Sequence, residues 1–300
     1  MWKTRVAVVV GLAMLVSCGQ PAQQQAQADA THSPAVAVPV TPHPDPLSQL
    51  ASNDPALAAN KRLVFDFWRT VINGGHVEAI DTMMAESYTQ HSPALPTGRA
   101  GIKQVFASIP RLEQVPELVS PPLVTSVGEG NLVVMALAEQ MPDPAGGKYT
   151  TTHFNLFRVD NGRLAEHWHS VQTPPGPKAL LPEEGGAQLI TGASGADQRA
   201  LLTATDPALA ANKQLVFEKM RQGTAITDPV VAMVAERDLV VVVTKHEFPH
   251  PHHAGRTYTT AWFDMFRIAN GRVVEHWDAA LKTGTPAPVY GAEAQQGEKK

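Results

Sequence analysis

The most regular pattern of apolar and polar positions is a pair of β-prone runs joined by Asn-Gly, and it occurs twice. It covers residues 154–169 and again residues 263–278, and both stretches contain Glu-His-Trp near their end. Asn and Gly tolerate the positive φ of a tight hairpin turn, so each stretch predicts a strand, a two-residue turn and a second strand. The chain is therefore expected to carry a duplicated β-hairpin.

Helical spacing precedes the first hairpin. Apolar residues recur at helical intervals from Leu57 to Val71, behind Asp54 as the N-cap. Shorter helices and then strands are predicted downstream, the helices over 77–84 and 102–109 and the strands over 115–127, 132–138, 148–159 and 163–172. Helices followed by an antiparallel meander indicate an α+β fold.

The start of this pattern also repeats. Residues 205–213 match residues 53–61 at eight of nine positions. The offset between the repeats falls from 152 positions there to 109 positions at the Glu-His-Trp motif, so the second repeat lacks about 43 residues. The shortened part corresponds to the two short helices and the loop around Tyr88. We therefore expect a complete domain over 53–172 and a truncated repeat over 205–283.

The remaining segments have the composition of tethers. Residues 18–52 are rich in Gln, Ala and Pro with few charges, residues 173–204 are rich in Pro, Gly and Ala, and residues 284–300 are polar. Segments that cannot bury a core stay irregular, so these are expected to be a flexible tether, an exposed linker and a disordered tail.

The N-terminus has the layout of a signal peptide over residues 1–17. A basic start is followed by an apolar run of 11 residues, Val6 to Val16, against about 20 needed to span a bilayer. The run leads to Cys18 in a sequence that resembles a bacterial lipobox. That resemblance implies a lipid anchor on Cys18 and, because Gly19 rather than Asp follows, a place on the outer membrane facing the periplasm. An ordinary signal peptide with an incidental cysteine is the alternative.

Composition narrows the function classes. The formal net charge of −4 gives no electrostatic footprint for nucleic acid. The single cysteine excludes an intrachain disulfide. No glycine-rich phosphate loop or Gly-x-Ser-x-Gly elbow occurs, so no cofactor is expected.

The motifs together resemble the SnoaL-like polyketide cyclase branch of the nuclear transport factor 2-like superfamily. They are Tyr88-x-Gln-His91-x-Pro93, Gly98-Arg99, the apolar strand at Leu132, and Phe157-Arg158-Val159 with Asn161-Gly162-Arg163 and Glu166-His167-Trp168; the second repeat adds Phe263-Asp264-Met265-Phe266-Arg267 and Glu275-His276-Trp277-Asp278. The resemblance implies a cone-shaped, curved antiparallel sheet with N-terminal helices, here duplicated. It also implies a pocket for a small apolar molecule and acid/base chemistry on a carbonyl compound, of aldol, cyclase or isomerase type.

The resemblance also points to site residues. In the family the residue after the tryptophan faces the pocket, is usually Asp, and works with a polar residue 14 positions earlier. Those positions hold Asn155 and His169 in the first repeat and Asp264 and Asp278 in the second. Further acid/base candidates are His91 and His153, and candidate ligand contacts are Tyr88, His167 and Trp262. The alternative is a non-catalytic binding or scaffold lipoprotein whose pocket is vestigial.

Strand alternation places Trp168 and Trp277 on the face away from the pocket. In this superfamily that convex face often forms a dimer interface. Two arrangements stay open: an intrachain pseudo-dimer of the two repeats, sheet to sheet, and a homodimer through the same face.

A histidine cluster in a predicted turn is the remaining metal candidate. His246, His250, His252 and His253 lie near Glu247 and could bind zinc or copper. A polar hairpin tip is the favoured interpretation, so no metal site is predicted.

Overall fold

The computed structural model describes residues 40–170, 174–176 and 178–285. The predicted signal peptide, Cys18 and most of the predicted tether lie outside these residues, as does nearly all of the predicted tail. Within the described ranges, no helix is both long enough and apolar enough to cross a membrane.

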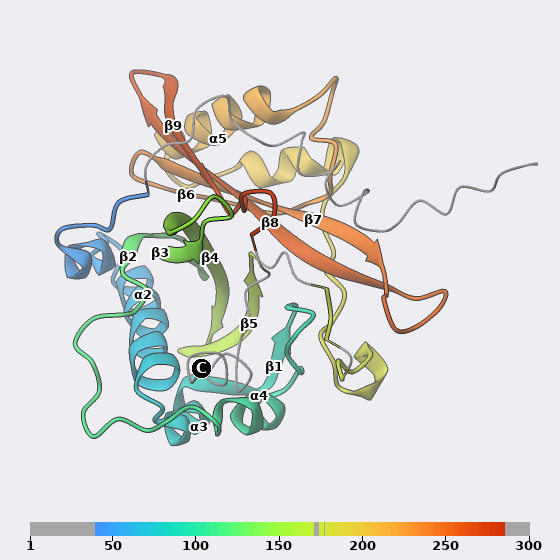
Figure 1. The fold of residues 1–300 in the computed structure, drawn as a ribbon. Coiled ribbons are helices and arrows are strands. Elements are labelled where there is room, and N and C mark those ends of the chain that lie inside the picture. The colour runs from blue at the N-terminus through green and yellow to red at the C-terminus, as the bar shows by residue number, and fades with distance from the viewer. Residues whose placement is uncertain (1–39, 171–173, 177, 286–300) are drawn as a thin grey trace, which may run out of the picture. The chain divides into compact units, whose positions relative to one another are not determined.

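Helices come first in the chain, as predicted (Figure 1). Helix α2 (Pro55–Phe67) begins at Asp54, whose side chain accepts a hydrogen bond from Ala56 N. It continues as a π-helix over Trp68–Asn73, and three short helices follow along the chain: the 3-10 helix Val77–Ala79, α3 (Ile80–Met83) and α4 (Arg99–Phe106). The structure thus combines helices with a curved sheet, and the α+β prediction is confirmed.

The first sheet has five strands in the order β1-β5-β4-β3-β2. They are β1 (Met84–Gln90), β2 (Leu123–Glu129), β3 (Leu132–Pro142), β4 (Lys148–Asp160) and β5 (Arg163–His169). Strand β1 pairs in parallel with β5, so the sheet is mixed and the prediction of a wholly antiparallel sheet is wrong. Strand β1 was not predicted from the sequence, which favours a loop around Tyr88. The strand has no apolar run, and only Met84, Tyr88 and Gln90 are buried in it.

The two Asn-Gly turns form as predicted. Asn161 and Gly162 have φ values of 48° and 69°, and Asn270 and Gly271 have 51° and 69°. Both residues of each turn therefore occupy the left-handed region that favours Asn and Gly. The turn starts the pairing of β4 with β5, and a bulge between Val159 and Arg158 shifts the register by one residue, so that Asn155 pairs with His169.

A second sheet follows in the C-terminal part of the described chain. Helix α5 (Pro207–Met220) leads, without a further helix, into strands β6 (Val230–Glu236), β7 (Leu239–Pro249), β8 (Thr257–Ala269) and β9 (Arg272–Asp278), which pair in that order. One face of this sheet packs against α5 through Phe217, Val240 and Phe266. Among the described residues, no helix lies between α5 and β6, where the sequence predicts the missing segment.

The segment between the two sheets differs from the exposed linker predicted for residues 173–204. It contains two 3-10 helices, Pro182–Glu184 and Gly195–Leu202. Ile190 is 2% exposed, and the side chain of Gln198 bonds the backbone of Ile226 and Asp228. A few apolar and amide side chains, among them Ile190 and Gln198, anchor this segment. A composition rich in Pro, Gly and Ala does not indicate such anchors.

The end of the predicted tether is also structured. Pro46–Leu50 form a 3-10 helix capped by Asp45, and Leu50 is buried in the core between the first sheet and its helices. His43 N donates to Leu123 O, which adds this segment to the edge of β2.

One core cluster draws residues from both sheets. The rings of Phe154 and Phe263 stack with centroids 5.4 Å apart and planes 2° from parallel. Trp168 and Trp277 belong to the same cluster, so each tryptophan lies on the face of its own sheet that is turned away from that sheet's helices, as predicted. Burial of apolar area of this kind is the main source of stability.

Two lysines connect each helix with the opposite sheet in a reciprocal way. Lys61 of α2 lies 2.9 Å from Glu236 of β6, and Lys213 of α5 lies 2.7 Å from Glu129 of β2. Both lysines are almost fully buried. The carboxylates also accept backbone hydrogen bonds across the contact, Glu236 from Gly128 N and Glu129 from Ala235 N.

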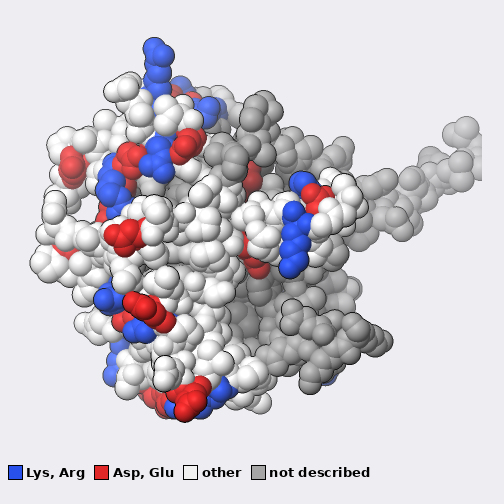
Figure 2. Space-filling model, turned by 60° about the vertical axis from the view of Figure 1, so that its left-hand side comes forward, with Lys and Arg blue, Asp and Glu red and all other residues white. Residues whose placement is uncertain are grey.

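Charged side chains on the face seen in Figure 2 lie in small groups of mixed sign. On that face, therefore, no single-sign patch is present that would steer a strongly charged ligand.

Candidate functional site

The helices and the curved sheet enclose a cavity of about 340 Å³. Its wall is mainly apolar and aromatic, with Phe67, Trp68, Ile72, Leu95, Val105, Phe106, Ile109 and Phe157. Small-molecule sites are concave, mostly apolar and roughly 300–1,000 Å³ in volume, so this cavity suits a small compound.

A polar cluster lies on the sheet side of this cavity. His153 and Asn155 alternate along β4, and His167 and His169 alternate along β5, so all four side chains face the cavity. His167 Nε2 lies 3.0 Å from Asn155 Oδ1, and its Nδ1 lies 3.2 Å from Gln90 Oε1. The prediction that Asn155, His153, His167 and His169 meet around one pocket agrees with this arrangement.

Tyr88 and Asn155 differ in what they offer a ligand. Tyr88 lines the cavity as predicted, and burial raises the pKa of its hydroxyl, so it stays protonated. Asn155 is 1% exposed, and its Nδ2 has no hydrogen-bond partner among the described residues. A buried N–H donor without a partner costs free energy, so this amide is a ready donor for a ligand oxygen.

Glu139 is the site residue that the sequence analysis missed. It lies on β3 and lines the cavity, and its Oε2 is 3.3 Å from His153 Nδ1. The predicted strand stopped at Ala138, whereas β3 runs to Pro142. Alternation from Met135 and Leu137, both buried against the helices, would have placed the next side chain, Glu139, on the same face.

Burial shifts the pKa values of Glu139 and His153 in opposite directions. It raises the pKa of Glu139 to about 7 and lowers the pKa of His153 to about 4. A charged group is disfavoured away from water, which favours the neutral acid and the neutral imidazole. Near pH 7 Glu139 therefore exchanges a proton readily while His153 stays neutral, and a carboxyl group with such a pKa is suited to acid/base chemistry.

The other two histidines of the cavity are also held neutral. Burial, with smaller effects from neighbouring histidines, lowers the pKa of His167 to about 3 and that of His169 well below its usual value. His169 Nε2 lies 3.3 Å from Ser92 Oγ. A base with so low a proton affinity is a weak one, so Glu139 rather than His169 has the stronger basic character.

These histidines predict acid lability. Each takes up a proton in the unfolded chain near pH 6.5 but only at lower pH in the folded one, so the unfolded state binds more protons and stability falls as pH falls below 6.5. The raised pKa of Glu139 has the opposite effect on stability, and it offsets the contribution of about one histidine. We expect the free energy of unfolding to drop by about 3 kcal/mol or more between pH 7 and pH 4, from His167 alone.

Urea unfolding at a series of pH values measures the slope of the free energy of unfolding against pH. His167→Gln should flatten it, whereas His252→Gln, a change in the loop before β8, should leave it as it is. An unchanged slope in the His167 variant would contradict the assignment.

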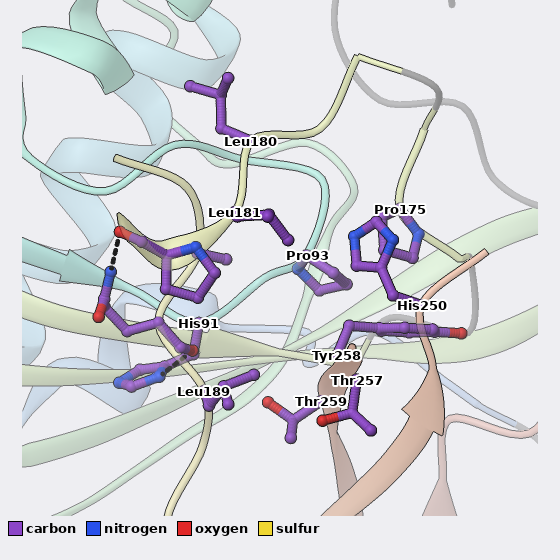
Figure 3. A pocket seen from close by; sticks show the side chains of 13 residues that line it. His91, Pro93, Pro175, Leu180, Leu181, Leu189, His250, Thr257, Tyr258 and Thr259 are labelled. Atoms are coloured by element: carbon purple, nitrogen blue, oxygen red, sulfur yellow. Dashed lines mark hydrogen bonds between the residues drawn. The ribbon is translucent and has the colours of Figure 1, made fainter. Parts of the chain in front are cut away.

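His91 does not reach the cavity, contrary to the prediction. Its ring stacks on Trp168 with centroids 4.7 Å apart, and its Nε2 lies 2.7 Å from Glu166 Oε1. His91 lies on one side of a separate small pocket, and His250 and Tyr258 lie on the other side (Figure 3). Strand alternation points Tyr88 and Gln90 into the cavity and therefore directs the next residue, His91, to the opposite face.

The second sheet holds the other predicted residues apart from the cavity. Asp264 and Asp278 are direct cross-strand partners on β8 and β9, and Trp262 lies two residues before Asp264 on the same face. That face is the one with Phe266, which packs toward α5. None of these residues lines the 340 Å³ cavity, so the two repeats do not pool their polar residues in one site.

The histidines of the predicted turn are dispersed over a strand and a loop. His246 stacks on Trp262 with centroids 6.0 Å apart, while His250 and His253 lie 4.6 Å apart, ring to ring, beyond the end of β7. Among the described residues, the group whose potential metal-binding atoms converge is a different one, Asp264, His276 and Asp278.

One family model matches part of the chain. Residues 64–167 match the family described as SnoaL-like domain. No match is found among curated proteins.

Several solved structures are similar to part of the chain. TsrD from Streptomyces laurentii is 20% identical, over 40% of this chain and 90% of that one, with a TM-score of 0.28. A candidate polyketide cyclase from Bacillus cereus is 19% identical over 45% and 90%, with a TM-score of 0.28. An NTF2-like protein of unknown function from Mesorhizobium loti is 18% identical over 44% and 98%, with a TM-score of 0.27.

The matched residues contain α2 from Val64 onward, the short helices and nearly all of the five-stranded sheet, and they supply most of the cavity wall. Residues 64–167 therefore form a SnoaL-like domain.

Proposed function

We propose that the cavity binds a small apolar carbonyl compound and moves a proton at the carbon next to its carbonyl group, as in aldol, cyclase or isomerase reactions. The observation that carries this proposal is Glu139, a carboxyl group with a pKa of about 7 in a largely apolar cavity. Such a group can take a proton from carbon near neutral pH and return it afterwards.

The roles follow from the chemistry of each side chain. The Glu139 carboxylate takes the α-proton, and the electron pair of the C–H bond moves onto the carbonyl oxygen, giving an enolate. Asn155 Nδ2 donates a hydrogen bond to that oxygen, which stabilises the developing negative charge. The enolate then takes the proton back from Glu139 at the same or a conjugated carbon. Alternatively, its carbon attacks a second carbonyl carbon to form a C–C bond, and the alkoxide formed from that carbonyl group takes the proton from Glu139.

His153 would orient the base. Its Nδ1 lies 3.3 Å from Glu139 Oε2, and its ring packs edge-on against Trp68 with centroids 5.9 Å apart. An imidazole that stays neutral can accept the proton of the Glu139 carboxyl group in a hydrogen bond, which fixes the direction of the carboxyl group.

Deuterium exchange tests this proposal without knowledge of the natural substrate. Cyclohexanone and 2-tetralone would be incubated with the full chain in buffered D₂O, and deuterium uptake at the α-carbon followed by mass spectrometry. Uptake above the buffer rate supports proton abstraction. Binding of either ketone, seen as quenching of Trp68 fluorescence that a Trp68→Phe variant lacks, without added exchange would favour the non-catalytic binding protein instead.

We further propose that the second sheet with α5 is a truncated copy of the first domain and that the two copies pack as an intrachain pseudo-dimer. The reciprocal pairs Lys61–Glu236 and Lys213–Glu129 support this proposal. A two-fold interface is self-complementary, so each contact recurs with the roles of the partners exchanged. The pairing of Asn155 with His169 and of Asp264 with Asp278 at equivalent register positions also supports it.

We also propose that Cys18 carries a lipid that anchors the chain to the outer membrane on its periplasmic side. The lipobox-like sequence before Cys18 supports this. In a Gram-negative host grown with an alkyne-bearing fatty acid, the wild-type chain is expected to be labelled and to sediment with membranes. Cys18→Ser should be unlabelled and leave the membrane fraction, because it lacks the lipid and its apolar run of 11 residues is shorter than the roughly 20 that a spanning helix needs. Equal labelling of both chains would contradict the proposal.

A further inference from the structure

We propose that Asp264, His276 and Asp278 form a binding site for one divalent transition-metal ion of the zinc class. The three residues lie on β8 and β9, on the face of the second sheet that carries Phe266. One potential ligand atom from each residue lies within 4.8 Å of the other two. This group is separate from the cavity of the SnoaL-like domain, so the proposal does not depend on the reaction proposed there.

The three side chains are held in place by their surroundings. His276 stacks on Phe266 with centroids 4.5 Å apart and planes 8° from parallel, and its Nε2 lies 2.7 Å from Asp264 Oδ1. Asp278 Oδ1 accepts a hydrogen bond of 2.9 Å from Ala280 N. Ligands fixed in this way lose little conformational entropy when an ion binds, which favours affinity.

A buried carboxylate oxygen gives a second, independent indication. Asp264 is 2% exposed, and its Oδ2 has no hydrogen-bond partner among the described residues. A buried, partly unsatisfied carboxylate is costly, since it has lost its hydration without full compensation. A cation bound by this oxygen would supply the missing interaction.

The first sheet shows what distinguishes the second. Asn155, His167 and His169 occupy the equivalent register positions there, and His167 stacks on Phe157 as His276 stacks on Phe266. In the second sheet the positions of Asn155 and His169 hold aspartates instead. Two carboxylates directly opposite each other on neighbouring strands repel, and a dication between them turns that repulsion into attraction.

The donor set indicates the class of ion. Two carboxylates with one imidazole suit Zn²⁺ and its neighbours better than Mg²⁺ or Ca²⁺, which prefer oxygen ligands alone. In a tetrahedral zinc site neighbouring ligand atoms lie roughly 3.3 Å apart, so small side-chain rotations suffice to close the group around an ion. Three protein ligands leave at least one coordination position open to water or another small ligand.

Calorimetry with the purified full chain in detergent tests the site, using ZnCl₂ and CoCl₂ as the probes. We expect one equivalent of each ion to bind, and the Co²⁺ complex to show the intense visible bands of a four- or five-coordinate ion. Asp264→Asn and, separately, Asp278→Asn should weaken binding at least 100-fold. Because asparagine has nearly the shape of aspartate, both variants should fold, and their melting temperature should no longer rise with added Zn²⁺ as that of the wild-type chain does.

The loop histidines provide the matched control. The double variant with His252→Gln and His253→Gln removes two of the four histidines near the β7–β8 turn that are the other candidate zinc ligands, and it should bind Zn²⁺ as tightly as the wild-type chain. Binding that is lost in this double variant but kept in Asp264→Asn would overturn the proposal. So would a lack of Zn²⁺ binding by the wild-type chain, or a preference for Mg²⁺ over Zn²⁺.

Discussion

Replacing Glu139 by Gln is expected to lower α-proton exchange of bound ketones by roughly 10²–10⁴-fold, the usual contribution of a positioned acid or base. The amide keeps the size of the carboxyl group but cannot take up a proton. Ketone binding, followed by quenching of Trp68 fluorescence, should change little, because the apolar wall of the cavity supplies most of the contact area. A loss of exchange without a loss of binding assigns the chemical step to this group.

The pH dependence gives an independent readout of the same assignment. Exchange should increase with pH and level off above the pKa of Glu139, about 7, since the carboxylate is the active form. If the base were His169, whose pKa is held well below its usual value, the increase would end at much lower pH. His169→Gln is the matched variant: a larger loss of exchange in it than in Glu139→Gln would contradict the role of Glu139.

Local sequence patterns predicted the parts of the fold that depend on local geometry. The Asn-Gly pairs at 161–162 and 270–271 require positive φ, which few residues adopt, so the two hairpins could be located from the sequence. The alternation around Trp168 likewise predicted which face of β5 carries His167 and His169. These features depend on neighbours in sequence and on the two-residue period of a strand.

The features that were missed depend on contacts distant in sequence. Strand β1 is defined by its parallel pairing with β5, more than 70 positions later, and its own residues carry no strand pattern. The basicity of Glu139 comes from burial under helices and not from its sequence neighbours. The family resemblance points to position 169 on β5, where a carboxylate is usual, whereas the carboxyl group in this cavity lies on β3, on the other side of β4.

Equivalent positions on paired strands carry different side chains in the cavity of the first domain and in the polar group of the second sheet. In the first, Asn155, His167 and His169 are neutral hydrogen-bonding groups, and the carboxyl group that lines the cavity is Glu139 on β3. In the second, the same register positions hold two carboxylates and a histidine. If the second sheet is a truncated copy, it lacks the helices that would close a cavity around an apolar compound. Its strands are then free to carry charged side chains, and a metal-binding site is compatible with the fold.

Replacing Lys61 by Ala is expected to lower the free energy of unfolding by about 3 kcal/mol, the lower end of the usual cost of breaking a buried ion pair, because Arg237 remains 3.3 Å from Glu236. The Lys61 side chain is fully buried and that of Glu236 is 11% exposed, so the carboxylate left behind is poorly hydrated. Lys213→Ala should cost less, because its partner Glu129 is 25% exposed and water can replace the lysine. Urea unfolding followed by circular dichroism measures both changes.

Removing both charges of the first pair separates electrostatics from packing. In Lys61→Met with Glu236→Gln the apolar stem is kept, and the glutamine oxygen can still accept from Gly128 N, so much of the lost stability should return. Because Lys61 lies on α2 beside the first sheet and Glu236 lies in the second sheet, a pseudo-dimer that folds as one unit should unfold in a single transition in every variant. A loss below about 1 kcal/mol in Lys61→Ala, or unfolding of the two sheets in separate steps in the wild-type chain, would contradict the proposed packing of the two copies.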